Sequence, residues 1–173
     1  MSSEPPFTLA DPERAREEAQ QLFEAVSQSL AAVLPRDADV RHVGATALPG
    51  CLTKGDLDIV DRVSAKDFTD ADVVLASRFA RNSGSIRTES FSAFEDALSR
   101  PHLGIQLVAI DGPFDFFHQF TEALQGSRQL LEEYNALKRS YEGADMALYR
   151  TAKDAFVERV LADSEGRTAD IRQ

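Results

Sequence analysis

The first hundred residues alternate between helix-like and strand-like spacing of apolar side chains. Over residues 12–34 apolar side chains recur every three or four positions, which predicts an amphipathic helix. Asp11 is suited to the N-cap of this helix and Pro12 to its first turn. Short apolar runs then predict strands over 39–43 and 56–63.

The pattern continues with a helix predicted over 65–80 and strands predicted over 85–94 and 102–111. From Phe114 onward the spacing is helical throughout. This order of elements predicts an α+β (or α/β) fold with a mixed sheet flanked by helices. It lacks the regular alternation of a doubly wound parallel sheet.

Three helices are predicted in the second part of the chain, over 114–125, 127–142 and 146–164, with Ser127 as a cap.

The length of 173 residues fits one domain, and 43% hydrophobic residues are enough for a sizeable core. We expect a loose arm over 1–10, a single domain over 11–163 with a helical part over 114–163, and a tail over 164–173.

The chain is acidic, with a net charge of -10 and a pI near 4.7. Such a charge repels nucleic-acid backbones and anionic membranes, so neither is an expected partner. Cys51 is the only cysteine, which excludes an intrachain disulfide. Neither a signal peptide nor a long apolar segment is evident, and we expect a cytoplasmic protein.

Asp56 and Asp58 are the first candidates for chemistry. They are two residues apart on a predicted strand, so their carboxylates should project to the same side. Aspartate is rare in strands, and two such carboxylates can converge on Mg²⁺ or Mn²⁺, which takes its other ligands from water and substrate phosphates. The alternative is a sheet face that is open to water.

The loop before this strand strengthens the metal-site interpretation. Gly44 and Gly50 permit unusual backbone conformations and close approach of a ligand, and Thr46 offers a hydroxyl. A short helix that began near Ala45 would present free N–H groups to a phosphate. The alternative is an ordinary connection between strands.

The run HVGATALPGCLTKGDLDIV over residues 42–60 resembles the signature of the GrpB (UPF0157) family. The run EYNALKRSYEGADMALYRTAKDAFVERVL resembles the closing helices of the same family. The likeness covers most of the chain from about residue 40. It implies a polymerase-β-like nucleotidyltransferase fold, with the C-terminal helices closing one side of a cleft.

The resemblance assigns a site residue by residue. It implies that Asp56 and Asp58 are catalytic and bind Mg²⁺ or Mn²⁺. The residues that it implies for nucleotide binding are Gly44, Ala45, Thr46, Lys54, Lys138, Tyr149 and Lys153. Two positions depart from the family pattern, since Ala45 replaces a usual serine and Gly55 a frequent proline.

Active enzymes of the superfamily use a third carboxylate on a neighbouring strand. The strand predicted over 102–111 carries Gln106 at its middle instead. His102 lies near its start, and Glu89 or Asp111 would substitute only if the fold brought either of them close.

Tyr149 and Lys153 are neighbours on one face of the predicted last helix, where the first would stack a base and the second would meet a phosphate. A solvated helix with a half-buried tyrosine is the alternative. His42, His118 and the phenylalanines of 114–120 are interpreted as structural, and Cys51 has no visible base to activate it.

The implied function is transfer of a nucleotidyl group from a nucleoside triphosphate to an unknown acceptor, with a metal neutralising charge on the phosphates. A catalytically inactive nucleotide- or ligand-binding module on the same fold is the alternative, favoured by Ala45 and Gln106. A helical interaction module over 114–163 is a third.

Overall fold

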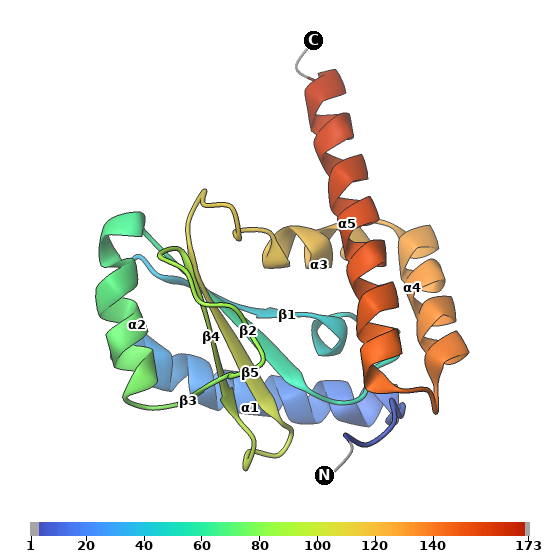
Figure 1. Cartoon of the computed structure of the whole chain (residues 1–173), viewed down its shortest axis with the longest axis horizontal. Helices are drawn as coiled ribbons and strands as arrows, with labels where there is room; N and C mark the ends of the chain where they lie inside the picture. The colour runs from blue at the N-terminus through green and yellow to red at the C-terminus, as the bar shows by residue number, and fades with distance from the viewer. Residues whose placement is uncertain (1–3, 172–173) are drawn as a thin grey trace.

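The computed structural model describes residues 4–171, with side chains up to Glu165. Five strands form one mixed sheet in the order β1-β2-β5-β4-β3, in which only β2 and β5 run parallel (Figure 1). The strands are β1 Asp39–Val43, β2 Leu57–Val63, β3 Ala80–Arg81, β4 Phe91–Asp96 and β5 Leu103–Ala109. The helices are α1 Pro12–Ala31, α2 Phe68–Ala76, α3 Phe117–Gln125, α4 Arg128–Tyr141 and α5 Met146–Ile171, with short 3₁₀ turns η1 Ala45–Ala47 and η2 Ala65–Asp67.

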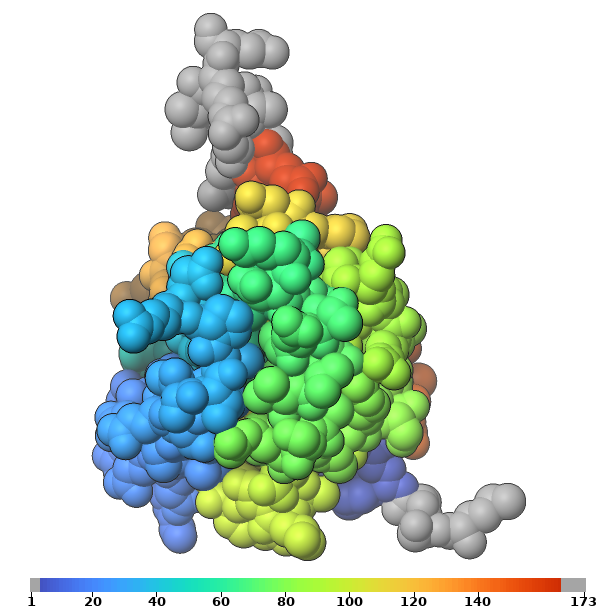
Figure 2. All heavy atoms as spheres, turned by 90° about the vertical axis from the view of Figure 1, so that its left-hand side faces the viewer, coloured from blue at the N-terminus to red at the C-terminus, as the bar shows by residue number. Residues whose placement is uncertain are grey.

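The predicted α+β class with a mixed sheet is confirmed. Helices α1 and α2 cover one face of the sheet (Figures 1 and 2). Their core contacts with the sheet include Leu57, Ile59, Ile105 and Leu107. A smaller apolar cluster on the opposite face contains Val60. Helices α3, α4 and α5 pack on one another beside the sheet, and the C-terminal part of α5 projects beyond the body (Figure 1).

Local sequence signals explain most element boundaries. The Asp11 carboxylate accepts the Arg14 N–H at the start of α1, and the Ser127 hydroxyl accepts the Leu130 N–H at the start of α4. The strand predicted over 85–94 begins only at Phe91. Residues 85–90 form bends and irregular backbone instead, and polar side chains in this region accept local backbone N–H groups, Asn82 that of Gly84 and Thr88 that of Ser90.

The structure describes part of the expected arm and tail, while residues 1–3 and 172–173 of these segments lie outside the described residues. The described part of the arm is anchored, since Phe7 is 1% exposed and stacks on Tyr149 with ring centroids 3.9 Å apart. The Phe7 N–H also donates to the Ala144 carbonyl. At the other end, α5 continues to Ile171, so the residues expected as a tail extend a helix as far as they are described. The stacking and burial of Phe7 hold the described part of the arm against the body.

Asp61 is an acidic residue at a buried position among apolar side chains. It shares the strand face of Leu57 and Ile59, as the alternation of β2 predicts, and it is 0% exposed. Neither of its carboxylate oxygens has a hydrogen-bond partner among the described residues. Burial therefore raises the pKa of Asp61 to about 7.

We expect the buried Asp61 to make stability depend on pH. Because the pKa in the folded state lies above the unfolded value near 3.8, folding favours the protonated carboxyl. The stability of the wild type relative to Asp61→Asn should fall by about 1.4 kcal/mol per pH unit between roughly pH 4 and 7, and level off above that. Urea denaturation of both proteins at several pH values measures it. A difference that does not vary with pH would contradict a buried protonated carboxyl.

Candidate functional site

The loop between β1 and β2 is held in place from three directions. Within the loop, the Thr46 hydroxyl donates to the Asp56 carbonyl at 2.9 Å. The Gly44 N–H donates to the Thr121 hydroxyl in α3 at 3.1 Å. In α4, the Asn135 side chain accepts the Leu52 N–H and donates to the Gly50 carbonyl, at 2.8 and 2.9 Å. The C-terminal helices thus fix the loop against the sheet.

A cavity of about 360 Å³ lies between this loop, the sheet and α3 to α5. This is within the usual range for small-ligand sites. Eight of the nine predicted site residues line the cavity: Gly44, Ala45, Lys54, Asp56, Asp58, Lys138, Tyr149 and Lys153. They come from segments about a hundred residues apart in the sequence.

Thr46 is the predicted site residue that does not line this cavity. It is buried, and its hydroxyl also lies 2.9 Å from the Nε2 of His42. It therefore acts on the site through the backbone of Asp56 and is not placed to contact a phosphate.

Asp58 sits between two glycines. A methyl group at Gly44 would lie 3.0 Å from one carboxylate oxygen of Asp58, and one at Gly104 would lie 3.1 Å from the other. Gly44 also has a φ of 77°, which side chains rarely tolerate. Gly104 pairs with Asp58 across the parallel β2–β5 ladder, so two strands create the space for one carboxylate.

The charges that face the cavity are only partly paired. Lys54 and Asp56 form an ion pair at 3.0 Å. No hydrogen bond or ion pair from the described residues reaches the Asp58 carboxylate, and its burial raises the pKa of that carboxyl, an effect that Lys153 opposes.

Lys138 is a buried cation that also lacks an ion pair with the described residues. It is 3% exposed, and its ammonium lies 4.4 Å from the Tyr134 ring centroid. No carboxylate of the described residues pairs with it, and burial lowers the pKa of this lysine to about 8.

The aromatic wall of the cavity differs from the expected one. The stacking of Phe7 covers one face of the Tyr149 ring, so that face is closed to a base. Phe116, Phe117 and Phe120 line the cavity, and Phe120 also belongs to a buried apolar cluster, in line with the structural interpretation of the phenylalanines of 114–120. The helical spacing of 117 and 120 places them on one side of α3, and only the position of α3 over the loop reveals that this side borders a cavity.

None of the proposed substitutes for a third carboxylate reaches the site. Gln106 itself lines the cavity, and its Oε1 is buried without a hydrogen-bond partner. Asp111 follows the far end of β5 from Gly104, and Glu89 precedes the β4 residue Phe91, which pairs near that same end. Among the described residues no group of three histidine, cysteine or acidic side chains is placed to hold a metal ion.

The oxygen atoms that face the cavity nevertheless fit a metal cation that takes its remaining ligands from a substrate. Asp56 and Asp58 offer two carboxylates, and Gln106 offers an unpartnered amide oxygen in the same cavity. Mg²⁺ prefers oxygen ligands and commonly takes one or two carboxylates, completing its shell with water and phosphate oxygens.

The remaining candidate groups have structural environments. Burial lowers the pKa of His42 to about 4, so this histidine is neutral near pH 7. Burial raises the pKa of the Cys51 thiol, which opposes its use as a nucleophile.

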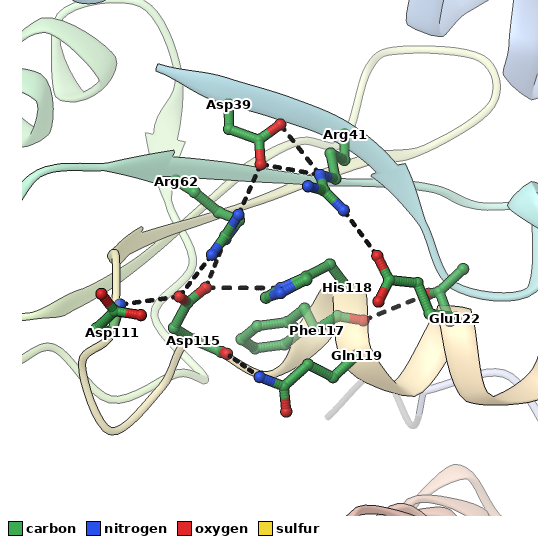
Figure 3. Close-up of polar contacts among 10 residues, drawn as sticks. Asp39, Arg41, Arg62, Asp111, Asp115, Phe117, His118, Gln119 and Glu122 are labelled. Atoms are coloured by element: carbon green, nitrogen blue, oxygen red, sulfur yellow. Dashed lines mark hydrogen bonds and ion pairs between the residues drawn. The ribbon is translucent and has the colours of Figure 1, made fainter. Parts of the chain in front are cut away.

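An ion-pair network anchors α3 (Figure 3), and residues of this helix line the cavity. The Asp115 carboxylate accepts from Arg62 in β2 through two hydrogen bonds of 2.6 and 2.8 Å. Asp39 in β1 bonds the same arginine at 2.7 Å. His118 lies 3.5 Å from Asp115, and burial lowers the pKa of this histidine. At the other end of α3, Glu122 accepts from Arg41 at 2.8 Å.

Comparison with known proteins identifies the family of this chain. The model of the GrpB protein family matches residues 12–163. The chain belongs to the GrpB family. A UPF0157 protein of Vibrio cholerae is 35% identical over 144 residues, which cover 83% of this chain and 76% of the relative. No helix among the described residues is long and apolar enough to cross a membrane.

Solved structures support the GrpB fold. GrpB from Enterococcus faecalis superposes with a TM-score of 0.67 at 16% identity, covering 93% of this chain and 98% of that one. The Cid1 poly(U) polymerase bound to MgGTP superposes with a TM-score of 0.51 at 12% identity. That match covers 75% of this chain but 41% of Cid1. This GrpB protein therefore has a nucleotidyltransferase-like fold, as the sequence predicted.

We expect the network at Asp115 to carry most of the attachment of α3. Asp115→Asn should lower the free energy of unfolding by about 3 kcal/mol, because it leaves the largely buried Arg62 without its main counter-charge. Glu122→Gln is the matched control. It removes an ion pair whose glutamate side chain is 57% exposed, so it should cost less than about 1 kcal/mol. Denaturation followed by circular dichroism measures both, and equal losses would contradict this assignment.

Proposed function

We propose that this protein binds a nucleoside triphosphate together with Mg²⁺ or Mn²⁺ in the cavity, and transfers its nucleotidyl group to an acceptor. One observation carries the proposal. Asp58 and Lys138 face the same cavity, and neither forms an ion pair with the described residues. A charge shielded from water without a partner is costly, fully so for the buried Lys138 and in part for Asp58, so the site favours a ligand that brings both signs of charge. A metal–triphosphate complex does so.

Three lysines at different depths of the cavity would contact the phosphates. Lys138 lies deep, where reduced screening by water strengthens its attraction to an anion. Lys153 faces the cavity from α5, and Lys54 lies at its edge beside Asp56. In a chain of net charge -10 these cations are needed to admit a triphosphate.

The nucleobase has an apolar place to bind. Phe116 and Phe117 stack on each other with centroids 4.7 Å apart, and both line the cavity. A base has an aromatic face of its own and stacks favourably on such rings.

The transfer step is a substitution at the α-phosphorus. The acceptor hydroxyl oxygen forms a bond to that phosphorus, the bond from phosphorus to the bridging oxygen breaks, and pyrophosphate leaves. In this proposal Asp56 accepts the hydroxyl proton. The metal, when bound, neutralises charge on the phosphates.

A binding module without transfer activity is the second candidate. It is favoured by Gln106, which offers an amide where a third carboxylate would complete a stronger metal site. Release of pyrophosphate from an Mg²⁺–nucleotide mixture, tested against a broad set of alcohols, distinguishes the two candidates.

We expect Mg²⁺–ATP to stabilise the wild type. At about 100 times its dissociation constant the gain is roughly 2.7 kcal/mol, which corresponds to about 5–10 °C in melting temperature. Asp58→Asn should lose most of this gain, because the amide carries no charge for the metal. The matched control is Asp70→Asn, which changes an exposed aspartate of α2. Equal gains in wild type and Asp58→Asn would place the nucleotide elsewhere.

The affinity for the triphosphate should depend on the charge of Lys138. Because the pKa of Lys138 is lowered to about 8, its ammonium is present below pH 8 and is lost above it. The dissociation constant should therefore rise by up to tenfold per pH unit above about pH 8. Lys138→Gln should bind more weakly and lack this rise. Calorimetric titrations between pH 7 and 9.5 measure both, and identical profiles would remove Lys138 from the phosphate site.

A further inference from the structure

A second cavity, of about 470 Å³, adjoins the first. Both cavities are lined by Lys54 and Asp56, so this ion pair forms the boundary between them. The second cavity is an open depression, lined otherwise by Gly55, by the start of α1 with Ala10 and Asp11 before it, and by the turn between β4 and β5. The turn is fixed next to the boundary, since the Leu57 N–H donates to the His102 carbonyl at 2.9 Å.

Basic side chains from three segments meet around this second cavity. Arg14 comes from α1, Lys54 from the loop, and Arg100 and His102 from the turn. Three acidic residues, Asp11, Glu18 and Asp56, line the same cavity, so its lysine and arginine charges are balanced in number.

The acidic residues that line the same cavity are already engaged. Asp11 accepts the Arg14 N–H, Glu18 pairs with the Arg14 side chain at 2.8 Å, and Asp56 pairs with Lys54.

Arg100 is the cation that lacks a counter-charge. Its guanidinium donates to the Ala97 and Ser99 carbonyls, both at 2.9 Å, and forms no ion pair with the described residues. These two bonds use one nitrogen, so the other donors of the guanidinium are available to an anion. An arginine held in this way is suited to a phosphate or carboxylate group.

We propose that the second cavity binds the acceptor, and that the acceptor is a small alcohol that carries an acidic group such as a phosphate. The proposal rests on the proposed function, because it takes the triphosphate to occupy the first cavity. The acidic group is held by Arg100, and the hydroxyl reaches the boundary at Asp56. There its oxygen bonds to the α-phosphorus, its proton passes to Asp56, and pyrophosphate leaves on the side of the first cavity.

Glycerol 3-phosphate is a suitable probe, with glycerol as its uncharged counterpart. In NMR titrations of the full chain, glycerol 3-phosphate should shift the backbone amides of Gly55 and His102, which line the second cavity. Glycerol should leave them unchanged. Arg100→Glu should weaken the binding of glycerol 3-phosphate at least fivefold. The matched control Arg78→Glu reverses an exposed arginine outside both cavities and should bind it as the wild type does.

A parallel measurement separates this proposal from the proposed function. If Mg²⁺–ATP stabilises the wild type but glycerol 3-phosphate leaves Gly55 and His102 unshifted, or binds Arg100→Glu equally well, only the acceptor site is overturned. If Mg²⁺–ATP does not stabilise the wild type, the proposed function fails and the acceptor role of the second cavity fails with it. Arginine-dependent shifts together with nucleotide stabilisation support both.

Discussion

The site depends on the confinement of the Asp58 carboxylate between two stretches of backbone. Gly44 in the loop and Gly104 in β5 approach it so closely that a methyl group on either would lie about 3 Å from a carboxylate oxygen. The parallel pairing of β2 with β5 brings Gly104 to this place, and the hydrogen bond to Thr121 holds Gly44. The carboxylate is thereby withheld from protein donors and left facing the cavity.

The C-terminal helices form the side of the cavity that faces the Asp58 carboxylate. Helix α3 is attached to the sheet by the Arg62–Asp115 ion pair, and α4 is attached to the loop by Asn135. Lys138 lies one helical turn beyond Asn135 in α4, so the residue that holds the loop also fixes the depth of the lysine. The unpaired Asp58 and Lys138 therefore belong to one connected set of contacts rather than to separate surfaces.

The sequence predicted most of this arrangement because its signals are local. Alternation in β2 placed Asp61 on the face of Leu57 and Ile59, and the caps at Asp11 and Ser127 set two helix starts. The family resemblance supplied residues that the fold brings to one cavity. What local patterns do not contain is which side of α3 faces the loop, or that Phe7 stacks on Tyr149. Those depend on contacts between segments distant in the chain, as does the second cavity.

The balance of charge explains why an acidic chain is suited to an anionic ligand at this place. A net charge of -10 opposes the approach of any phosphate, yet the field of distant surface charges is screened within about 10 Å in salt, while that of a buried lysine is not. Lys138 can therefore dominate at short range despite the overall charge. Repulsion at long range then disfavours long polyanions such as nucleic acids, which contact much of the surface. In the proposed complex a compact metal–triphosphate carries fewer charges and places them against the lysines, so the charge distribution that repels a polyanion would select a small anion.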